Sequence, residues 1–386
     1  MRILHLDCST GFGGQERDHI TEAQGFANKG HEYILGVRSG TLFEEEAKKE
    51  TRTLSLPLRS NMDLESFRLI RKVLIDEKID VLVTTSYIDS WIGALAARSL
   101  GSKRPLIIRQ RHILNTPHNL FPFRHMCDKL VVVSDVLRIF FIEQGIPFWH
   151  VVSIHRGISV TNIPLGTSGS AAKTRGDHSL PAQGPIALQV GTFQKDKGHF
   201  LMIEALGTIW KRIPDFVMVF LGEGPLKDEV IAAARKKYPD KLGKQLVFRD
   251  RESPEPYFSI ASVSLLPSIR ESLSLVTMES MLHGVPVVAF RVGGIPEIFN
   301  VSPNGKMVRP QDPVAFAEGV IEVLSDPEMT RTTHQSHSEK IVRHFSIERS
   351  VQRTELLYEA EIRRIRSGER NKNHYQRSGG AGDPFL

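Results

Sequence analysis

Short apolar runs that alternate with stretches of helical spacing constrain this chain more than any other feature. Residues 2–6 and 81–84 are two such runs, each bounded by polar residues, and residues 64–75 between them carry apolar side chains at helical spacing. Short runs of this kind are typical of parallel strands that are buried on both faces. The alternation therefore predicts an α/β chain in which helices cover both faces of a parallel sheet.

The same alternation resumes after residue 185 and predicts a second doubly wound half. Its apolar runs, separated by helical stretches, cover residues 186–190, 216–221, 245–248, 263–266 and 285–290. The chain has 386 residues, which is enough for two domains that each bury a core. Two α/β domains are the expected architecture.

The sequence divides into five predicted parts. The segment GTSGSAAKTRGDHSLPAQG at 166–184 consists of small, polar and helix-breaking residues that we expect not to pack, and we interpret it as a linker or mobile loop. The last residues are polar and Gly-rich, which favours disorder. The parts are an N-terminal domain at 1–165, the linker at 166–184, a C-terminal domain at 185–345, a closing helix at 346–366 that could cross back to the N-terminal domain, and a disordered tail at 367–386.

Composition excludes several classes of protein. Lys and Arg number 50 against 44 Asp and Glu, and 40% of the residues are hydrophobic, which excludes a disordered or fibrous chain. Two cysteines are too few for a disulfide framework or a four-cysteine zinc site. No apolar run approaches the ~20 residues that span a bilayer, and the start MRILHLDCS lacks the pattern of a secretory signal. We therefore expect a cytoplasmic protein.

The stretch 265–300 carries the strongest chemical signal. It reads as a buried strand that ends at Pro267, a polar loop, a helix capped by Ser274, a second strand and a glycine turn. Open α/β sheets bind ligands at the carboxyl ends of their strands, and the unpaired N–H groups at a helix start favour an anion such as a diphosphate. Glu271 and Glu279 bracket that helix start and could accept hydrogen bonds from sugar hydroxyls. Two glutamates without further context would more often be ordinary surface charges.

The surrounding string changes that balance. PSIRESLSLVTMESMLHGVPVVAFRVGGIPEI resembles the E-x7-E region of retaining GT-B glycosyltransferases of family 4, the glycogen-synthase-like enzymes. Around it, in the order expected for this family, stand VGTFQKDKGH at 190–199, LGEGPLKDEV at 221–230, FRDRESPEPYFSIASVSLLPS at 248–268 and NGKMVRPQDPVAFAEGV at 304–320. The resemblance covers most of residues 185–345 and implies the GT-B fold, in which two Rossmann-like doubly wound domains face each other across a cleft.

The resemblance also implies roles for individual residues. It assigns Glu271 to the donor sugar, Glu279 to the ribose, and Lys197 to the leaving diphosphate. Thr192 stands where relatives have an arginine, so Lys195 or Arg270 could replace that charge. The expected donor site comprises Gly13, Gly14, Gly191, Thr192, Lys195, Lys197, Gly222, Gly224, Arg249, Glu271, Ser272, Leu273, Ser274, Leu275 and Glu279.

Two N-terminal strings extend the resemblance. GFGGQE at 11–16 is similar to the family's glycine-rich loop, although it lacks the GxGxxG spacing of a dinucleotide site. RQRHILNTP resembles the stretch that carries the family's active-site histidine, which makes His112 the third catalytic candidate beside Lys197 and Glu271. His118 is a nearby alternative, and a lone histidine is more often structural. Relatives commonly have Asn-Gly-Val/Ile-Asp where residues 156–159 read Arg-Gly-Ile-Ser.

Residues 90–127 form a basic segment without acidic residues. It contains three aromatic residues and six basic ones, namely Arg98, Lys103, Arg104, Arg109, Arg111 and Arg124. Such a segment could bind a phosphorylated or lipid-linked acceptor or an anionic membrane surface, and it could equally be a solvated basic face. No recognition motif accompanies it, so we expect no nucleic acid partner.

The resemblance to family 4 implies a retaining, hexosyltransferase-like glycosyltransferase. It would move a sugar from a nucleotide diphosphate sugar to a glycan or lipid-linked acceptor, with envelope polysaccharide or lipopolysaccharide synthesis as the family's range and peripheral contact with the inner membrane face as an open alternative. No DxD-type aspartate pair and no His/Cys cluster with ligand spacing occurs in the sequence, so we expect no metal and no cofactor. The rival functions are a nucleotide-sugar epimerase or hydrolase of the same fold and an inactive sugar-nucleotide-binding protein.

Overall fold

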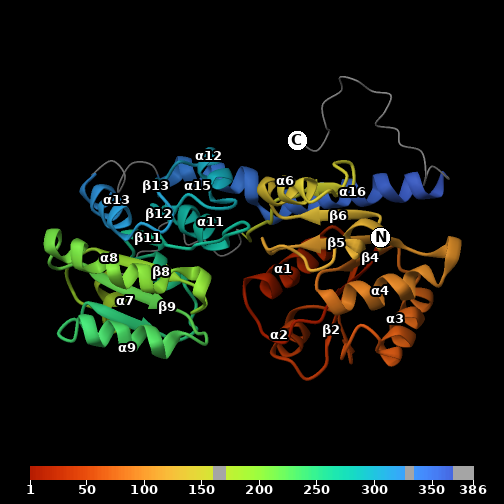
Figure 1. Cartoon of the computed structure of the whole chain (residues 1–386), viewed down its shortest axis with the longest axis horizontal. Helices are drawn as coiled ribbons and strands as arrows, with labels where there is room; N and C mark the ends of the chain where they lie inside the picture. The colour runs from red at the N-terminus through yellow and green to blue at the C-terminus, as the bar shows by residue number, and fades with distance from the viewer. Residues whose placement is uncertain (160–170, 327–333, 368–386) are drawn as a thin grey trace, which may run out of the picture. The chain divides into compact units, whose positions relative to one another are not determined.

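A computed structural model describes residues 1–159, 171–326 and 334–367 (Figure 1). The chain divides into a first unit, Met1–Ser159 with Phe345–Leu386, and a second unit, Val160–His344. None of the described helices combines the length and the apolar character that a membrane crossing requires.

The first unit contains a seven-stranded parallel sheet with the order β3-β2-β1-β4-β5-β6-β7. Its strands are β1 (Arg2–Asp7), β2 (Glu32–Arg38), β3 (Thr53–Leu56), β4 (Val81–Thr84), β5 (Leu106–Arg111), β6 (Lys129–Val132) and β7 (Val151–Ser153). Its helices are α1 (Gly14–Asn28), α2 (Leu42–Glu50), α3 (Leu64–Asp76), α4 (Tyr87–Arg98), η1 (Gly101–Lys103), α5 (Phe121–His125), α6 (Asp135–Glu143) and α16 (Ile347–Arg366).

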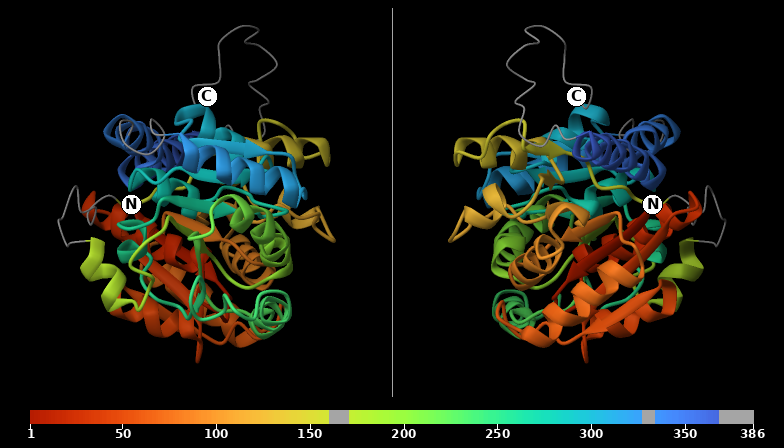
Figure 2. Two further views of the ribbon diagram at one scale, coloured as in Figure 1. Left: turned by 90° about the vertical axis from the view of Figure 1, so that its left-hand side faces the viewer. Right: turned by 90° about the vertical axis from the view of Figure 1, so that its right-hand side faces the viewer.

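Alternate residues of β1 explain why helices cover both faces of this sheet. Ile3 is buried in one core with Phe26 of α1 and Tyr358 of α16, whereas Leu4 is buried in the other core with Ile70 of α3. Because side chains of a strand point alternately to opposite faces, a continuous apolar run needs cover on both sides. Helices α1 and α16 pack together on one face, and α3 and α4 lie side by side on the other (Figures 1 and 2).

The second unit contains a six-stranded parallel sheet with the order β10-β9-β8-β11-β12-β13. Its strands are β8 (Ile186–Val190), β9 (Val217–Leu221), β10 (Leu246–Arg249), β11 (Val263–Leu266), β12 (Val287–Phe290) and β13 (Gly305–Val308). Its helices are α7 (Ala171–Asp177), η2 (Lys195–Lys197), α8 (His199–Arg212), α9 (Lys227–Lys237), α10 (Glu255–Phe258), α11 (Leu275–Leu282), α12 (Ile295–Val301), α13 (Pro313–Ser325) and α15 (His334–Phe345).

The predicted fold class is confirmed in both units. In each sheet the strand order reverses beside the first strand of the unit, between β1 and β4 and between β8 and β11. Loops at such a reversal leave the carboxyl ends of neighbouring strands toward opposite faces, which opens a crevice for a ligand. The fold therefore offers one such position in each unit.

The segment 166–184 differs from the predicted linker where the structure describes it. Residues 171–177 form α7, and Leu180 is buried in a core of the second unit. Arg175 donates hydrogen bonds to the carbonyl oxygens of Pro181 and Gly184, at 2.7 Å each. The expectation that 171–184 does not pack is wrong, because one leucine and one arginine anchor its small residues. Residues 166–170 and 368–386 lie outside the described residues.

Candidate active site

The strand reversal of the second unit brings two predicted site residues together. Lys197 follows β8 in η2, and Glu271 follows β11. The Lys197 Nζ lies 2.6 Å from Glu271 Oε1, and the same oxygen accepts a hydrogen bond from Ser268 Oγ at 3.0 Å. A cation and an oriented carboxylate thus occupy the position where open α/β sheets bind ligands.

Glycines hold these two loops against each other. A side chain at Gly198, where φ is +68°, would place its Cβ 1.8 Å from the carbonyl oxygen of Pro267. At Gly293, where φ is +52°, a Cβ would lie 1.5 Å from the carbonyl oxygen of Glu271, which also accepts the N–H of Gly294 at 3.3 Å. Only glycine allows both the left-handed conformation and the close approach. The glycines of the sequence therefore fix the backbone on either side of the ion pair.

Three further glycines of the predicted donor site meet at the ends of β8 and β9. A Cβ at Gly222 would lie 2.1 Å from the carbonyl oxygen of Gly191, and one at Gly224 would lie 2.6 Å from the backbone nitrogen of Phe193. These two glycines are explained by the packing of the turns. A Cβ at Gly191 would meet nothing within 4 Å, so the backbone there is open to a ligand.

Helix α11 begins directly after the Glu271 loop. The hydroxyl of Ser274 caps it by accepting the N–H of Thr277 at 3.2 Å. Ser274 and its neighbour Leu273 are buried, whereas Ser272, Leu275 and Glu279 are half-buried. The first N–H groups of such a helix have no partner within it and carry a partial positive charge that attracts anions.

Other predicted donor residues are placed less directly. Thr192 and Lys195 are exposed, and the Lys195 side chain makes no hydrogen bond or ion pair within the described ranges. The Arg249 guanidinium donates to the carbonyl oxygen of His178. Sequence reasoning missed Lys227, whose Nζ donates to the carbonyl oxygens of Gly222 at 3.1 Å and of Arg249 at 3.0 Å. Its signal was present in the string LGEGPLKDEV.

The first unit carries a buried polar network at the reversal between β1 and β4. Asp7, at the end of β1, accepts hydrogen bonds from Ser9 Oγ at 2.8 Å, Gln15 Nε2 at 3.1 Å and Ser86 Oγ at 2.9 Å. Asp7 also accepts the backbone N–H of Ser9 at 2.9 Å, and His19 Nδ1 of α1 lies 3.2 Å from Asp7 Oδ2. Both members of this pair are almost entirely buried, so the pair is shielded from water.

His112 joins this network from the end of β5. Its Nε2 lies 3.4 Å from His19 Nε2, and its Nδ1 lies 3.6 Å from Asp18 Oδ2. The Arg156 guanidinium donates to Asp18 at 2.8 Å and to the carbonyl oxygen of Gly14 at 2.6 Å. His118, by contrast, is exposed, so of the two candidate histidines only His112 meets polar partners of the network.

The glycine-rich loop ends beside the same network. Gly13 precedes α1, and its N–H donates to the Glu16 carboxylate at 2.8 Å. Gly14 is the first residue of α1 and contacts Arg156 through its carbonyl oxygen. The two glycines predicted for the donor thus lie in the first unit, at the carboxyl end of β1.

Burial and neighbouring charges shift the pKa values in this network. Burial opposes protonation of His19, but the adjacent Asp7 carboxylate outweighs it and raises the pKa of His19. Burial alone would raise the pKa of Asp7, yet His19 and Ser9 hold that pKa well below its usual range. Burial, reinforced by the nearby Arg156 charge, lowers the pKa of His112, which is therefore a neutral imidazole at neutral pH.

Two acids of the network are shifted in the opposite direction. Burial, with the nearby Asp18 charge, raises the pKa of Glu22 to about 7. Burial, with the Asp7 charge, likewise raises the pKa of Asp89 to about 7. Glu22 also accepts hydrogen bonds from Gln110 Nε2 at 3.1 and 3.2 Å. The first unit therefore contains groups that change charge near neutral pH.

Sequence reasoning missed Asp7, Asp18, His19 and Glu22. A signal existed, because Gln15, Asp18, His19 and Glu22 follow the glycine-rich loop at the spacing of one helix face.

The predicted basic surface at 90–127 also needs correction. Arg109 is 3% exposed and lies 3.6 Å over the Phe123 ring, and Arg104 forms a two-pronged ion pair with Asp128 at 2.6 Å for each bond. Those two charges are taken up inside the unit.

Comparison with known proteins places the chain in a family. Residues 170–339 match the family described as glycosyl transferases group 1, and residues 12–162 match glycosyltransferase family 4. The D-inositol 3-phosphate glycosyltransferase of Corynebacterium urealyticum is 26% identical over 238 residues, 57% of this chain and 55% of that protein. The lipopolysaccharide core biosynthesis glycosyltransferase LpsE of Rhizobium meliloti is 29% identical over 197 residues, 50% of this chain and 55% of LpsE. The matches span about half the length of these curated relatives.

Solved structures match over nearly the whole chain. A glycosyltransferase from Rickettsia africae ESF-5 aligns with a TM-score of 0.80 and 21% identity, over 94% of this chain and 98% of that one. Anabaena Alr3699/HepE, in complex with UDP-glucose, aligns with a TM-score of 0.77 and 16% identity, over 95% and 100% of the two chains. At these identities the likeness shows the fold. The chain belongs to the group 1, family 4 glycosyltransferases, and its two parallel-sheet units have the GT-B fold.

Proposed function

We propose that this protein transfers a sugar from a nucleotide diphosphate sugar to an acceptor hydroxyl, with retention of the anomeric configuration. The observation that carries the proposal is the 2.6 Å pairing of Lys197 with Glu271 beside the start of α11, in a chain of this family. The similar protein HepE has been crystallised with UDP-glucose, which makes a UDP-sugar the first donor to test.

The donor's diphosphate would lie between Lys197 and the first turn of α11. An ammonium group has three N–H donors, so Lys197 can keep its contact with Glu271 while it donates to a phosphate oxygen. Charge that develops on the departing diphosphate would be stabilised by this cation and by the helix N–H groups. Glu271 would accept a hydroxyl of the donor sugar, and Glu279 the ribose hydroxyls.

Retention is proposed through departure and attack on the same face of the sugar. A covalent route needs a carboxylate at the anomeric carbon, whereas Glu271, which Lys197 and Ser268 hold through Oε1, is assigned to a hydroxyl of the donor sugar. An oxygen of the leaving phosphate would therefore take the proton of the acceptor hydroxyl. Neutral His112 would orient the sugar or the acceptor, because a neutral imidazole offers one donor and one acceptor nitrogen.

The reaction is proposed to need no metal ion, since Lys197 and the start of α11 supply positive charge for the diphosphate. For the acceptor we propose a glycan or lipid-linked molecule of the cell envelope, supported by the 29% identity to LpsE. Turnover that is unchanged by EDTA is the expected result. Loss of turnover in EDTA, restored by Mg²⁺, would contradict metal independence.

Binding without turnover is the second candidate. It is favoured by Thr192, an exposed neutral residue at the position where relatives have a positive charge. Incubation of the protein with UDP-glucose and a pool of envelope glycan acceptors, followed by mass spectrometry, separates the functions. A glycosylated acceptor supports transfer, free sugar indicates a hydrolase, an isomerised nucleotide sugar indicates an epimerase, and thermal stabilisation without any product indicates a binding protein.

A further inference from the structure

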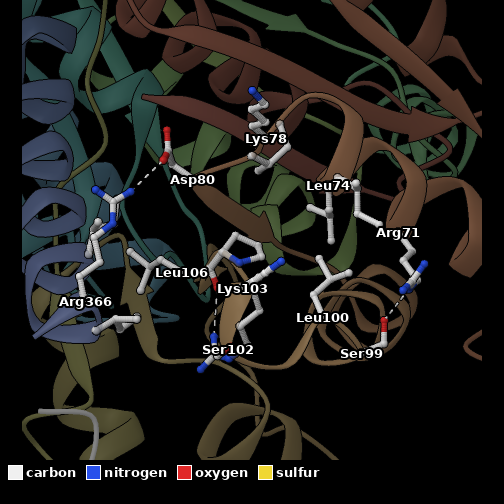
Figure 3. A pocket seen from close by; sticks show the side chains of 16 residues that line it. Arg71, Leu74, Lys78, Asp80, Ser99, Leu100, Ser102, Lys103, Leu106 and Arg366 are labelled. Carbon is white, nitrogen blue, oxygen red and sulfur yellow. Dashed lines mark hydrogen bonds and ion pairs between the residues drawn. The ribbon is translucent and has the colours of Figure 1, made fainter. Parts of the chain in front are cut away.

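A cavity of about 940 Å³ lies in the first unit. Figure 3 shows the side chains that line it. Its lining includes Asp80, just before β4, and Leu106, the first residue of β5. His112 follows the other end of β5, and six strand residues span roughly 20 Å. The cavity is therefore at the amino ends of the strands, opposite the edge where the acceptor is proposed to bind.

Five basic residues line the cavity, and carboxylates pair with two of them. Its basic residues are Arg71, Lys78, Lys103, Arg104 and Arg366. Arg104 is paired with Asp128, and Arg366 lies 3.3 Å from Asp80. Within the described ranges, the other three have no ion-pair partner, and the contact of the Arg71 guanidinium is a hydrogen bond from Nε to Ser99 Oγ at 3.1 Å. Three cations without an ion-pair partner in the described part of the chain therefore line one cavity. They are Arg71 of α3, Lys78 just after α3 and Lys103 of η1.

The floor between these charges is apolar. Leu74 and Leu106 are buried beneath it, and Leu100, Ile362 and Ile365 are half-buried around it. Ile75 of α3 also lines the cavity and is 47% exposed. An apolar floor with a basic rim fits a ligand that has both an anionic group and a hydrophobic part.

The backbone at Lys78 gives a second, independent indication. The N–H of Lys78 donates to the carbonyl oxygen of Ile75, and the N–H of Ile79 donates to that of Leu74, at 3.2 Å each. This is the Schellman ending of a helix, and Lys78 occupies its left-handed position with φ at 49°. Glycine is the usual and more stable residue there. The stability of the fold therefore does not explain why a lysine occupies this position. A role of its positive charge in binding an anion would explain it.

We propose that this cavity binds a phosphate ester. Lys78, Lys103 and Arg71 would hold the phosphate, and Leu74, Leu100 and Ile365 would contact the apolar part of the ester. A free phosphorylated compound and the headgroup of a lipid share this chemistry. The cavity lining shares no residue with the proposed donor site or with the network around His112, so the proposal does not depend on the transfer reaction.

The test is calorimetric titration of the full chain with n-octyl phosphate, with n-octanol as the uncharged control. We expect n-octyl phosphate to bind and n-octanol not to bind. The substitutions Lys78→Gly and Lys103→Ala should each weaken binding by roughly tenfold, through loss of a charge-assisted hydrogen bond. Lys72→Ala removes an exposed α3 lysine that is not part of the lining and should leave binding unchanged.

Lys78→Gly also separates binding from folding. It should raise the melting temperature, because glycine fits the left-handed position better, and it should weaken the binding of n-octyl phosphate. Cosedimentation with phosphatidylcholine vesicles, with and without phosphatidic acid, then identifies the source of the phosphate. Lys78-dependent binding to the phosphatidic acid vesicles supports a lipid headgroup, and Lys78-dependent binding of n-octyl phosphate alone supports a soluble ester. No binding of either probe, or binding that both substitutions leave unchanged, would overturn the proposal.

Discussion

The two units place polar residues at the same point of similar sheets but bury them to different extents. In the first unit, the Asp7 and His19 side chains are 1% and 0% exposed. In the second unit, the Glu271 and Lys197 side chains are 12% and 28% exposed. A shared topology therefore yields a closed polar network in one unit and an open ion pair in the other. Substitutions in the closed network should therefore affect mainly the stability of the fold, and substitutions in the open pair should affect mainly ligand binding and catalysis.

The largest expected effect is on the folding of the first unit. Asp7→Asn removes the charge that raises the pKa of His19, and breaking a buried pair typically costs about 3–5 kcal/mol. Chemical denaturation should show a loss of this size. Asp76→Asn, at an exposed position of α3, is the matched control and should change stability little. An equally small loss for Asp7→Asn would remove the distinction between the units.

The second unit should respond in catalysis instead. Lys197→Ala should lower kcat about 10²–10³-fold, as removal of a group that stabilises developing negative charge does. The free energy of unfolding should fall by at most about 1 kcal/mol, because the pair is partly exposed. Lys211→Ala, at an exposed position in the last turn of α8, is the control and should retain most activity. A stability loss as large as that of Asp7→Asn would contradict the assignment.

The pH dependence of stability should also differ between the units. The pKa of Glu22 is about 7 in the folded protein and takes its ordinary value of 4.5 in the unfolded chain. The stability that the protonated form gives is therefore complete below pH 4.5 and is lost as the pH rises through about 7. Glu22→Gln removes this loss. Relative to the wild type, the variant should gain on the order of 3 kcal/mol from low to high pH across that window. Parallel stability curves for the two proteins would show that Glu22 does not titrate there.

The smallest expected effect concerns donor affinity. Glu279→Ala should weaken nucleotide binding by roughly tenfold, the cost of losing hydrogen bonds to a charged acceptor. Titration of UDP into the wild type and the variant measures it. Lys72→Ala in the first unit should bind UDP as the wild type does. Unchanged affinity in Glu279→Ala would exclude the ribose role.

The site was predictable from the sequence where residues that are close along the chain are also in contact in the structure. The loop around Glu271 and the cap at Ser274 lie within one string, so a local pattern contained their geometry. The network around Asp7 did not show in the same way, because His19 and His112 are 93 residues apart and charged residues are ordinarily assigned to the surface. The prediction that Arg109 lies on a basic surface was wrong for the second of these reasons. Its charge is buried over the Phe123 ring instead.

The central claim is that the open ion pair of the second unit holds the diphosphate of an activated sugar. A crystal structure of the protein soaked with UDP-glucose tests it most directly. We predict that the diphosphate lies within hydrogen-bonding distance of the Lys197 Nζ and the first N–H groups of α11. Density for the ligand at any other place, with the Lys197–Glu271 pair untouched, would contradict the claim.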